Sequence, residues 1–313
     1  WLQDHSPKVA VTPSRDIENF LPSCERGDRT RWFLKIQDGC DYFCTYCTIP
    51  YARGRSRSGN IADLVSRAEQ AAGEGAKEIV ITGVNIGEFG NDNGQSFFEL
   101  LKDLDKVHGV ERFRISSIEP NLLTDDIIDW VADSRAFMPH FHIPLQSGSD
   151  HVLKMMNRRY DTDLFRERID HIKRAMPHAF IGVDVIAGAR GETEEEWLRA
   201  KAFIESLPIT RLHVFPYSER PGTAALKLPD PVEPAIRHKR VSELIDISDR
   251  KLKDFLIEET GRETSVLWEH TNHDGKIQGF TDNYIRVHAP FDESLPNTVT
   301  PIVLTKENIV TAQ

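Results

Sequence analysis

The sequence predicts an α/β fold built on a parallel sheet, followed by a smaller antiparallel β-barrel. Two observations predict this class. From about residue 31, short apolar runs alternate with amphipathic helical stretches, and near residue 260 this rhythm gives way to short segments of alternating polarity. The length of 313 residues allows a large domain of about 200 residues together with a small second one.

Residues 1–30 are polar and interrupted by Pro7, Pro13 and Pro22, so we expect a linker there. Six apolar runs then predict strands: Trp32–Ile36, Glu78–Thr82, Arg112–Ser116, His140–Pro144, Gly182–Ile186 and His213–Pro216. The stretches between them have a helical period: 61–74, 96–107, 124–133, 150–156 with 162–175, and 193–206. Such βα units give a parallel sheet with its active residues at the strand carboxyl ends, whether the sheet closes into a barrel or stays open.

A long charged helix is predicted from about 234 to 260, with an apolar stripe facing the core. Short β segments follow at 265–268, 276–280, 284–287 and 298–304, separated by turn residues such as Asp274-Gly275. We therefore expect a catalytic domain at 31–260 and a small β-barrel domain at 261–313.

The composition excludes some classes of protein. No run of about 18 apolar residues is present, so a membrane-spanning helix is not expected. The net charge of −10 argues against non-specific nucleic-acid binding, although a local basic face can exist on an acidic protein. Three of the four cysteines lie within eight residues, which suits a metal centre in a reducing, cytoplasmic compartment better than a disulfide framework.

The central motif is Cys40-x3-Cys44-x2-Cys47, which follows the first predicted strand. Three thiolates can hold a 4Fe–4S cubane and leave its fourth iron open to a chelating substrate. The competing interpretation is a zinc site completed by Cys24 or a nearby histidine, in an RNA-binding module without catalysis. It is disfavoured because Cys24 lies 16 residues upstream and paired Cys-x2-Cys knuckles are absent.

The triad, with Tyr46 before its last cysteine, resembles the radical S-adenosylmethionine (SAM) superfamily. The resemblance implies a partial (β/α)6 barrel, a 4Fe–4S cluster on the three cysteines, and cleavage of SAM to a 5′-deoxyadenosyl radical. The block from Cys40 to Arg57 and the later blocks at 81–87, 116–120, 142–150 and 215–223 resemble the methylthiotransferase family within it. Residues 279–287 resemble its terminal RNA-binding TRAM domain.

The segment Lys35–Arg57 is most similar to the branch that modifies threonylcarbamoyladenosine beside the tRNA anticodon, at position 37. That implies replacement of the hydrogen on adenine C2 by a methylthio group. Two other branches, acting on isopentenyladenosine in tRNA and on an aspartate of a ribosomal protein, remain alternatives.

The resemblance also implies particular site residues. The positions for SAM are Tyr46, Thr82, Gly83, Asn85, Ser117, Glu119, Gln146, Arg158, Asp184, Ile186 and Gly188. Those for the tRNA substrate are Arg53, Arg55, Arg57, Tyr217, Arg220, Phe280, Tyr284 and Arg286. The sequence departs from the family pattern at Ala189-Arg190, where an aromatic residue and a proline usually stand.

The family carries a second, auxiliary 4Fe–4S cluster on an N-terminal domain with three more cysteines, and that cluster is tied to sulfur delivery. This chain begins at Trp1 and has no second triad, so we expect that domain to be missing here. The expected partners are the tRNA anticodon stem-loop and an electron donor such as flavodoxin or ferredoxin, with no membrane involved.

Overall fold

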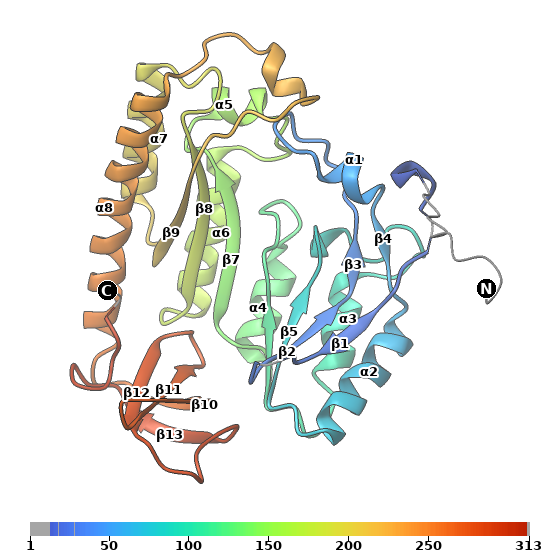
Figure 1. Cartoon of the computed structure of the whole chain (residues 1–313), viewed down its shortest axis with the longest axis vertical. Coiled ribbons are helices and arrows are strands. Elements are labelled where there is room, and N and C mark those ends of the chain that lie inside the picture. Colours follow the sequence, from blue (N-terminus) through green and yellow to red (C-terminus); the bar gives the residue numbers. More distant parts are fainter. Residues whose placement is uncertain (1–12, 18, 28, 312–313) are drawn as a thin grey trace, which may run out of the picture.

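The computed structural model describes residues 13–17, 19–27 and 29–311. Its largest feature is a curved wall of parallel strands (Figure 1). The six strands are β2 (Trp32–Lys35), β5 (Glu78–Thr82), β6 (Arg112–Ile115), β7 (His140–Gln146), β8 (Phe180–Ala187) and β9 (Arg211–Pro216). Each corresponds to one of the six runs predicted from apolar patterning: β5 has the predicted bounds, and the other five strands differ from the prediction only at their ends.

The wall consists of two hydrogen-bonded sheets, β2-β5-β6 and β7-β8-β9, all of whose neighbours are parallel. Parallel bridges from Phe113 to Phe137 and from Ser117 to His142 join the two sheets. In the described residues β9 pairs only with β8, so the wall stays open at that edge. The architecture is the partial (β/α)6 barrel, which decides the alternative that periodicity had left open.

An additional strand, β1 (Ser23–Glu25), pairs antiparallel with β2 at the other edge. It lies inside the expected linker 1–30, of which residues 1–12, 18 and 28 fall outside the described part of the chain. Sequence reasoning assigned no strand here because three residues among prolines and charges show no alternation. Its core contact is Cys24, which packs against the main hydrophobic cluster.

Helices cover the outer face of the wall and bury their apolar stripes against it. They begin where capping residues stand: Ser96 forms a capping box with Glu99, and Thr193 accepts a hydrogen bond from the Glu196 amide. No described helix is long and apolar enough to cross a membrane. The helices are α2 (Ile61–Gly73), α3 (Phe97–Leu104), α4 (Asp125–Asp133), α5 (Asp150–Met155), α6 (Thr162–Ala175), α7 (Glu194–Ser206) and α8 (Pro234–Glu258).

A curled antiparallel sheet follows α8, in the order β12-β11-β10-β13. Its strands are β10 (Glu263–His273), β11 (Lys276–Thr281), β12 (Arg286–Pro290) and β13 (Val299–Val303). The β10–β11 hairpin turns at Asp274-Gly275, where both residues have positive φ, as a tight two-residue turn requires. This sheet agrees with the expected TRAM-like fold and lies below the amino ends of the barrel strands (Figure 1).

Two arginines on β6 join the barrel to this sheet. Arg114 binds the buried carboxylate of Glu78 with two hydrogen bonds of 3.1 Å and donates to the Asp282 carbonyl. Arg112 lies 3.7 Å from Glu78 and donates to the carbonyls of Phe280 and Ser265. One carboxylate therefore orients two guanidinium groups toward the backbone of the second sheet.

We predict that Glu78→Gln lowers the free energy of unfolding by about 3 kcal/mol, because it leaves two buried arginines without a counter-charge. Burial acts to raise the pKa of Glu78, but Arg114, then Arg112 and Arg31, hold it below its usual value. The ionised carboxylate thus stabilises the fold at neutral pH, and this stabilisation fades as the pH falls through the acidic folded-state pKa.

Urea denaturation followed by circular dichroism measures this change. The control is Glu111→Gln, which removes an exposed carboxylate paired with Lys77 and should cost less than about 0.5 kcal/mol. Equal stabilities of the two variants would contradict the role assigned to Glu78.

Candidate active site

The three cysteines of the motif lie in one loop between the short strand β3 (Gln37–Asp38) and helix α1 (Ile49–Arg53). The loop follows β2, at the carboxyl end of the barrel, at the top of Figure 1. Its path is fixed at Gly39, whose φ is +73° and where a Cβ would meet the Arg55 carbonyl at 1.9 Å. Hydrogen bonds from the Cys40 amide to the Gly54 carbonyl (3.2 Å) and from the Cys47 amide to the Cys44 carbonyl (3.0 Å) close it.

The buried carboxylate of Asp38 anchors this loop. Lys35 donates to it at 2.8 Å, and Arg57 and Arg53 lie 3.3 and 3.6 Å away. Burial alone would raise the pKa of Asp38, but the Lys35 hydrogen bond, the Gly39 amide and the nearby cations hold it below its usual value. The carboxylate therefore stays ionised and gathers the cations of the motif around the loop.

This arrangement places the arginines that the sequence suggested for tRNA. Arg57 is buried and donates to the carbonyls of Asn19, Arg53 and Arg55. Arg53 and Arg55 are exposed, although Arg55 also pairs with Asp41 at 3.2 Å. The Arg57 side chain is thus occupied inside the loop, whereas Arg53 and Arg55 can still reach a ligand.

Hydrogen-bond donors face all three sulfur atoms. The Tyr42 amide lies 3.4 Å from Cys40 Sγ, the Ile49 amide lies 3.4 Å from Cys47 Sγ, and Arg158 Nη1 lies 3.1 Å from Cys44 Sγ. Burial raises the pKa of Cys40 to about 12, so this thiol ionises when a metal takes the place of its proton. The donors suit cluster-bound thiolates because they offset negative charge that burial penalises.

The zinc alternative finds no support in this geometry. Among the described residues, no three Cys, His, Asp or Glu side chains are grouped closely enough to hold a single metal ion. Thiolates of a cubane bind separate iron corners and need not converge on one point. Cys24 lies on the edge strand β1 opposite Leu34, apart from the cysteine loop, and burial raises the pKa of its thiol to about 11.

A buried arginine connects the cysteine loop to two other loops. Arg158, which follows α5, pairs with Glu119 after β6 and also donates to the hydroxyl groups of Tyr160 (3.0 Å) and Tyr46 (3.4 Å). Tyr160 in turn donates to the Pro144 carbonyl at the end of β7. Burial raises the pKa of Glu119 despite the Arg158 charge beside it. Three of the positions suggested for SAM, Tyr46, Glu119 and Arg158, are therefore in one contact network with Cys44.

Five further positions suggested for SAM lie at the same end of the barrel: Thr82, Gly83, Asn85, Gln146 and Ile186. Gln37 accepts hydrogen bonds from the amides of Val84 and Asn85, which brings the loop after Thr82-Gly83 beside the cysteines. Gln146 ends β7 with a left-handed φ of +64°. Ile186 packs with Tyr46 and Tyr217 in a small apolar cluster.

Some of the suggested positions lie elsewhere or have other partners. Asp184 on β8 binds His142 on the neighbouring strand β7 at 2.7 Å. His213, on β9, stacks its ring on that of His142. Ser117 bridges to His142 through the backbone. Gly188 donates its amide to the buried Glu192. Arg220 is exposed in the loop after β9.

Phe280, Tyr284 and Arg286 lie at the other end of the barrel, on and beside β11 and β12. Phe280 is buried and stacked on Tyr284, with ring centroids 4.7 Å apart, while Arg286 is exposed. Sequence reasoning missed the histidines that line the lumen, His140, His142 and His213. The spacing of His140 and His142 could have indicated them, because residues two apart on a strand point to the same face of the sheet.

Comparisons with known proteins identify the family and the fold of this chain. A family model described as the radical SAM superfamily matches residues 34–204. Coproporphyrinogen III oxidase (HemN) from Escherichia coli has a similar solved structure, with a TM-score of 0.54 and 16% identity over 82% of this chain and 65% of that one. The radical SAM methyltransferase TsrM from Kitasatospora setae gives a TM-score of 0.53 and 16% sequence identity, over 62% of this chain and 38% of that one. These likenesses show the fold.

Curated relatives share far more sequence. Threonylcarbamoyladenosine tRNA methylthiotransferase MtaB of Bacillus subtilis is 39% identical over 305 residues, 96% of this chain and 66% of that protein. The protein of the same name from Aquifex aeolicus is 36% identical over 92% of this chain and 69% of that protein. tRNA-2-methylthio-N(6)-dimethylallyladenosine synthase of Thermoanaerobacter pseudethanolicus is 31% identical over 100% of this chain and 68% of that protein. The chain spans about two thirds of the length of these relatives. It therefore belongs to the radical SAM superfamily and, within it, to the methylthiotransferase family.

Proposed function

We propose that this chain is the catalytic part of a tRNA methylthiotransferase that modifies C2 of threonylcarbamoyladenosine at position 37. The observation that carries the proposal is the contact network linking Cys44, Arg158 and Glu119 at the carboxyl end of a radical SAM barrel. The substrate follows the relatives named for threonylcarbamoyladenosine, which are 36–39% identical to this chain.

Cys40, Cys44 and Cys47 would hold the 4Fe–4S cluster that the superfamily uses. When bound, the cluster supplies the electron that cleaves SAM to methionine and a 5′-deoxyadenosyl radical. Arg158 lies beside Cys44 and carries Glu119 on its outer nitrogen. This pair offers one group of each sign, so it matches the carboxylate and ammonium groups of the SAM methionine. We assign Arg158 and Glu119 to that end of SAM.

The adenosine of SAM would lie against the strand ends that carry Gln146 and Ile186, next to Tyr46. These residues come from β7, β8 and the cysteine loop, and Tyr46 and Ile186 pack against one apolar cluster. A barrel wall of this kind keeps water from a reactive radical and holds it close to its target. The anticodon stem-loop of tRNA, an electron donor of the flavodoxin or ferredoxin kind, and a cytoplasmic location complete the proposal.

A second candidate substrate is dimethylallyladenosine (isopentenyladenosine) in tRNA. The relatives named for it are 31–35% identical to this chain. Competition between anticodon stem-loops carrying either modified adenosine distinguishes the two candidates. Preferential binding of the threonylcarbamoyl form supports the proposal, and preferential binding of the other form replaces it.

Removal of one cluster ligand should abolish SAM cleavage. In Cys44→Ala, we expect the iron content of anaerobically reconstituted protein to fall and 5′-deoxyadenosine, read by mass spectrometry after addition of SAM and dithionite, to drop below detection. The matched control is Cys24→Ala, which removes a thiol on β1 and should leave both readings unchanged. Deoxyadenosine formation by Cys44→Ala would refute the assignment of the triad.

Replacement of the network arginine should weaken SAM binding. For Arg158→Gln, the loss of a charge-assisted hydrogen bond of about 1.5–3 kcal/mol corresponds to a weakening of roughly 10- to 100-fold. We expect this as a rise in the KM for SAM in the deoxyadenosine assay, with cluster content retained. The control is Arg199→Gln, an exposed arginine on α7 paired with Glu195. An unchanged KM in Arg158→Gln would show that Arg158 only supports the loop.

The 313-residue chain alone should cleave SAM without forming a methylthio product. Its triad accounts for one cluster, and the only other thiol, Cys24, is on the edge strand β1 away from the site. The assay supplies threonylcarbamoyladenosine-containing tRNA, SAM and dithionite, then measures deoxyadenosine and the methylthio nucleoside from the same digest. Formation of the methylthio nucleoside by this chain would contradict the need for a second cluster.

A further inference from the structure

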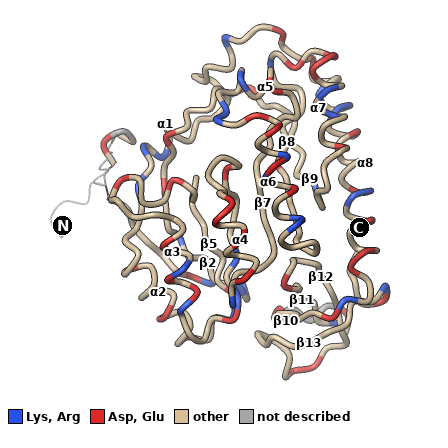
Figure 2. The backbone as a smooth tube through the Cα atoms, turned by 180° about the vertical axis from the view of Figure 1, so that it is seen from behind, with Lys and Arg blue, Asp and Glu red and all other residues tan. Residues whose placement is uncertain are grey.

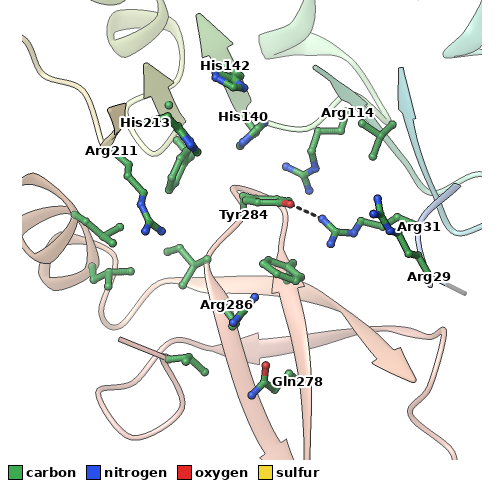
Figure 3. Close-up of a pocket in the computed structure, with 18 of the residues that line it drawn as sticks. Arg29, Arg31, Arg114, His140, His142, Arg211, His213, Gln278, Tyr284 and Arg286 are labelled. Atoms are coloured by element: carbon green, nitrogen blue, oxygen red, sulfur yellow. Dashed lines mark hydrogen bonds between the residues drawn. The ribbon is translucent and has the colours of Figure 1, made fainter. Parts of the chain in front are cut away.

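A cavity of about 1190 Å³ lies between the inside of the barrel wall and the C-terminal sheet. Six lysines and arginines line it, against one carboxylate, that of Asp274, so the cavity as a whole is basic. Two histidines, His142 on β7 and His213 on β9, line its barrel side. Figure 3 shows both imidazole rings above Tyr284, which lies in the connection between β11 and β12.

These two histidines and Asp184 of β8 project from the inner face of the barrel. Residues that alternate with them along the strands, such as Ile143 and Val183, belong to the hydrophobic core beneath the helices. Successive residues of a strand point to opposite faces, so the three polar side chains point away from that core and into the barrel. Three neighbouring strands therefore bring two imidazoles and one carboxylate together.

A glycine lets the two imidazoles meet across the strand between them. Gly182 of β8 is the register partner of His142 on β7. A Cβ at Gly182 would lie 3.5 Å from Nε2 of His213, so a longer side chain would occupy the space that this ring fills. The rings of His142 and His213 thus stack with their centroids 5.0 Å apart, although their backbones are two strands apart.

Asp184 fixes the orientation of one of these rings. Its Oδ1 lies 2.7 Å from Nε2 of His142, and the two side chains are only 20% and 29% exposed. A carboxylate at Nε2 favours a proton on that nitrogen and directs Nδ1 elsewhere. Among the described residues, no other hydrogen bond involves the His142 ring and none involves the His213 ring. Both histidines therefore have ring nitrogens available to a ligand.

The histidine pair lies next to the contact network assigned to SAM. The Ile118 amide, one residue before Glu119, donates to the His142 carbonyl at 3.0 Å. Two residues after His142, the Pro144 carbonyl accepts a hydrogen bond from Tyr160, whose hydroxyl also contacts Arg158. A ligand held by His142 would therefore lie beside SAM.

A neutral heteroaromatic base fits this place better than an anion. Imidazole rings can stack on a base and exchange hydrogen bonds with its ring nitrogens or amino group. An anion at His142 would instead approach the carboxylate of Asp184, and like charges brought together cost free energy. The chemistry of the three side chains thus favours the base of a nucleotide over its phosphate.

We propose that His142 and His213 hold the target adenine inside the barrel, and that Asp184 is a positioning residue that acts through His142. The inference rests on the proposed function, in which the hydrogen on adenine C2 is removed. That step breaks the C2–H bond and forms a C–H bond of 5′-deoxyadenosine, which leaves the unpaired electron on C2. The histidines do not exchange this hydrogen. They set the distance over which it moves.

The test follows that hydrogen atom. The reconstituted chain receives SAM, dithionite and an anticodon stem-loop whose threonylcarbamoyladenosine carries deuterium at C2. Mass spectrometry then gives the fraction of 5′-deoxyadenosine that contains deuterium, a ratio that does not depend on the rate of SAM cleavage. We expect His142→Ala combined with His213→Ala to lower this fraction at least 10-fold, because small displacements of a reacting group cost large factors in rate.

Two variants of Asp184 separate positioning from folding. Asp184→Asn keeps an oxygen that can accept the Nε2 proton of His142, so it should retain most of the deuterium transfer. Asp184→Ala removes that acceptor and should lower the transfer as the histidine variant does. The two variants should differ in this way while their urea denaturation midpoints are compared directly.

A matched control lies on the outside of the barrel. The outer helices α4 and α6 carry acidic and basic residues (Figure 2), and His171 of α6 pairs there with Asp129 of α4 at 2.6 Å. His171→Ala removes a histidine–aspartate pair of the same kind that faces no cavity residue of the barrel. It should leave the deuterium fraction unchanged.

The other outcomes are equally specific. An unchanged deuterium fraction in the His142 and His213 variant, or an equal fall in His171→Ala, overturns the inference and leaves the proposed function standing. Loss of all deoxyadenosine in that variant overturns it too, because the histidines would then serve SAM. Deoxyadenosine without deuterium from the unsubstituted chain overturns the substrate assignment and the inference together.

Discussion

The buried carboxylate of Glu78 is the interaction on which the arrangement of the two sheets depends. Burying a lone carboxylate is costly, and the nearby guanidinium groups of Arg114 and Arg112 offset that cost. Their remaining donors bind carbonyl groups of residues 265–282 in the C-terminal sheet. The same set of charges therefore fills the amino end of the barrel, fixes the second sheet against it, and shapes the basic cavity between them.

Parallel strands make the two ends of this barrel chemically different. All carboxyl ends meet at one rim, so loops far apart in sequence bring Cys44, Glu119 and Arg158 into contact there. The amino ends meet at the opposite rim, where Arg112, His140 and Arg211 begin their strands beside the C-terminal sheet. Because all six strands run in the same direction, the barrel has one rim that carries the cysteine loop and an opposite rim that faces the C-terminal sheet.

The sequence predicted the six strands, the helices between them and the cysteine loop, because each depends on local patterning that one segment carries by itself. It could not predict β1, whose three residues become a strand only by pairing with β2. It also grouped Arg57 with its exposed neighbours, since burial beside Asp38 is a tertiary property. For Phe280 and Tyr284 the sequence suggested RNA contact, with core packing expected for at least one of the two rings. In the structure Tyr284 packs against His140, and Arg31 lies over Phe280.

Buried arginines and carboxylates in the described part of the chain lie next to groups of opposite charge. Arg240 meets Glu192 at 2.8 Å, Arg158 meets Glu119, and Asp38 is surrounded by Lys35, Arg53 and Arg57. In each case a carboxylate accompanies the cations, as a low-dielectric site requires. Arg211, Lys276 and Arg286 are exposed to water, which solvates their charges, so they can face one cavity without a carboxylate beside them.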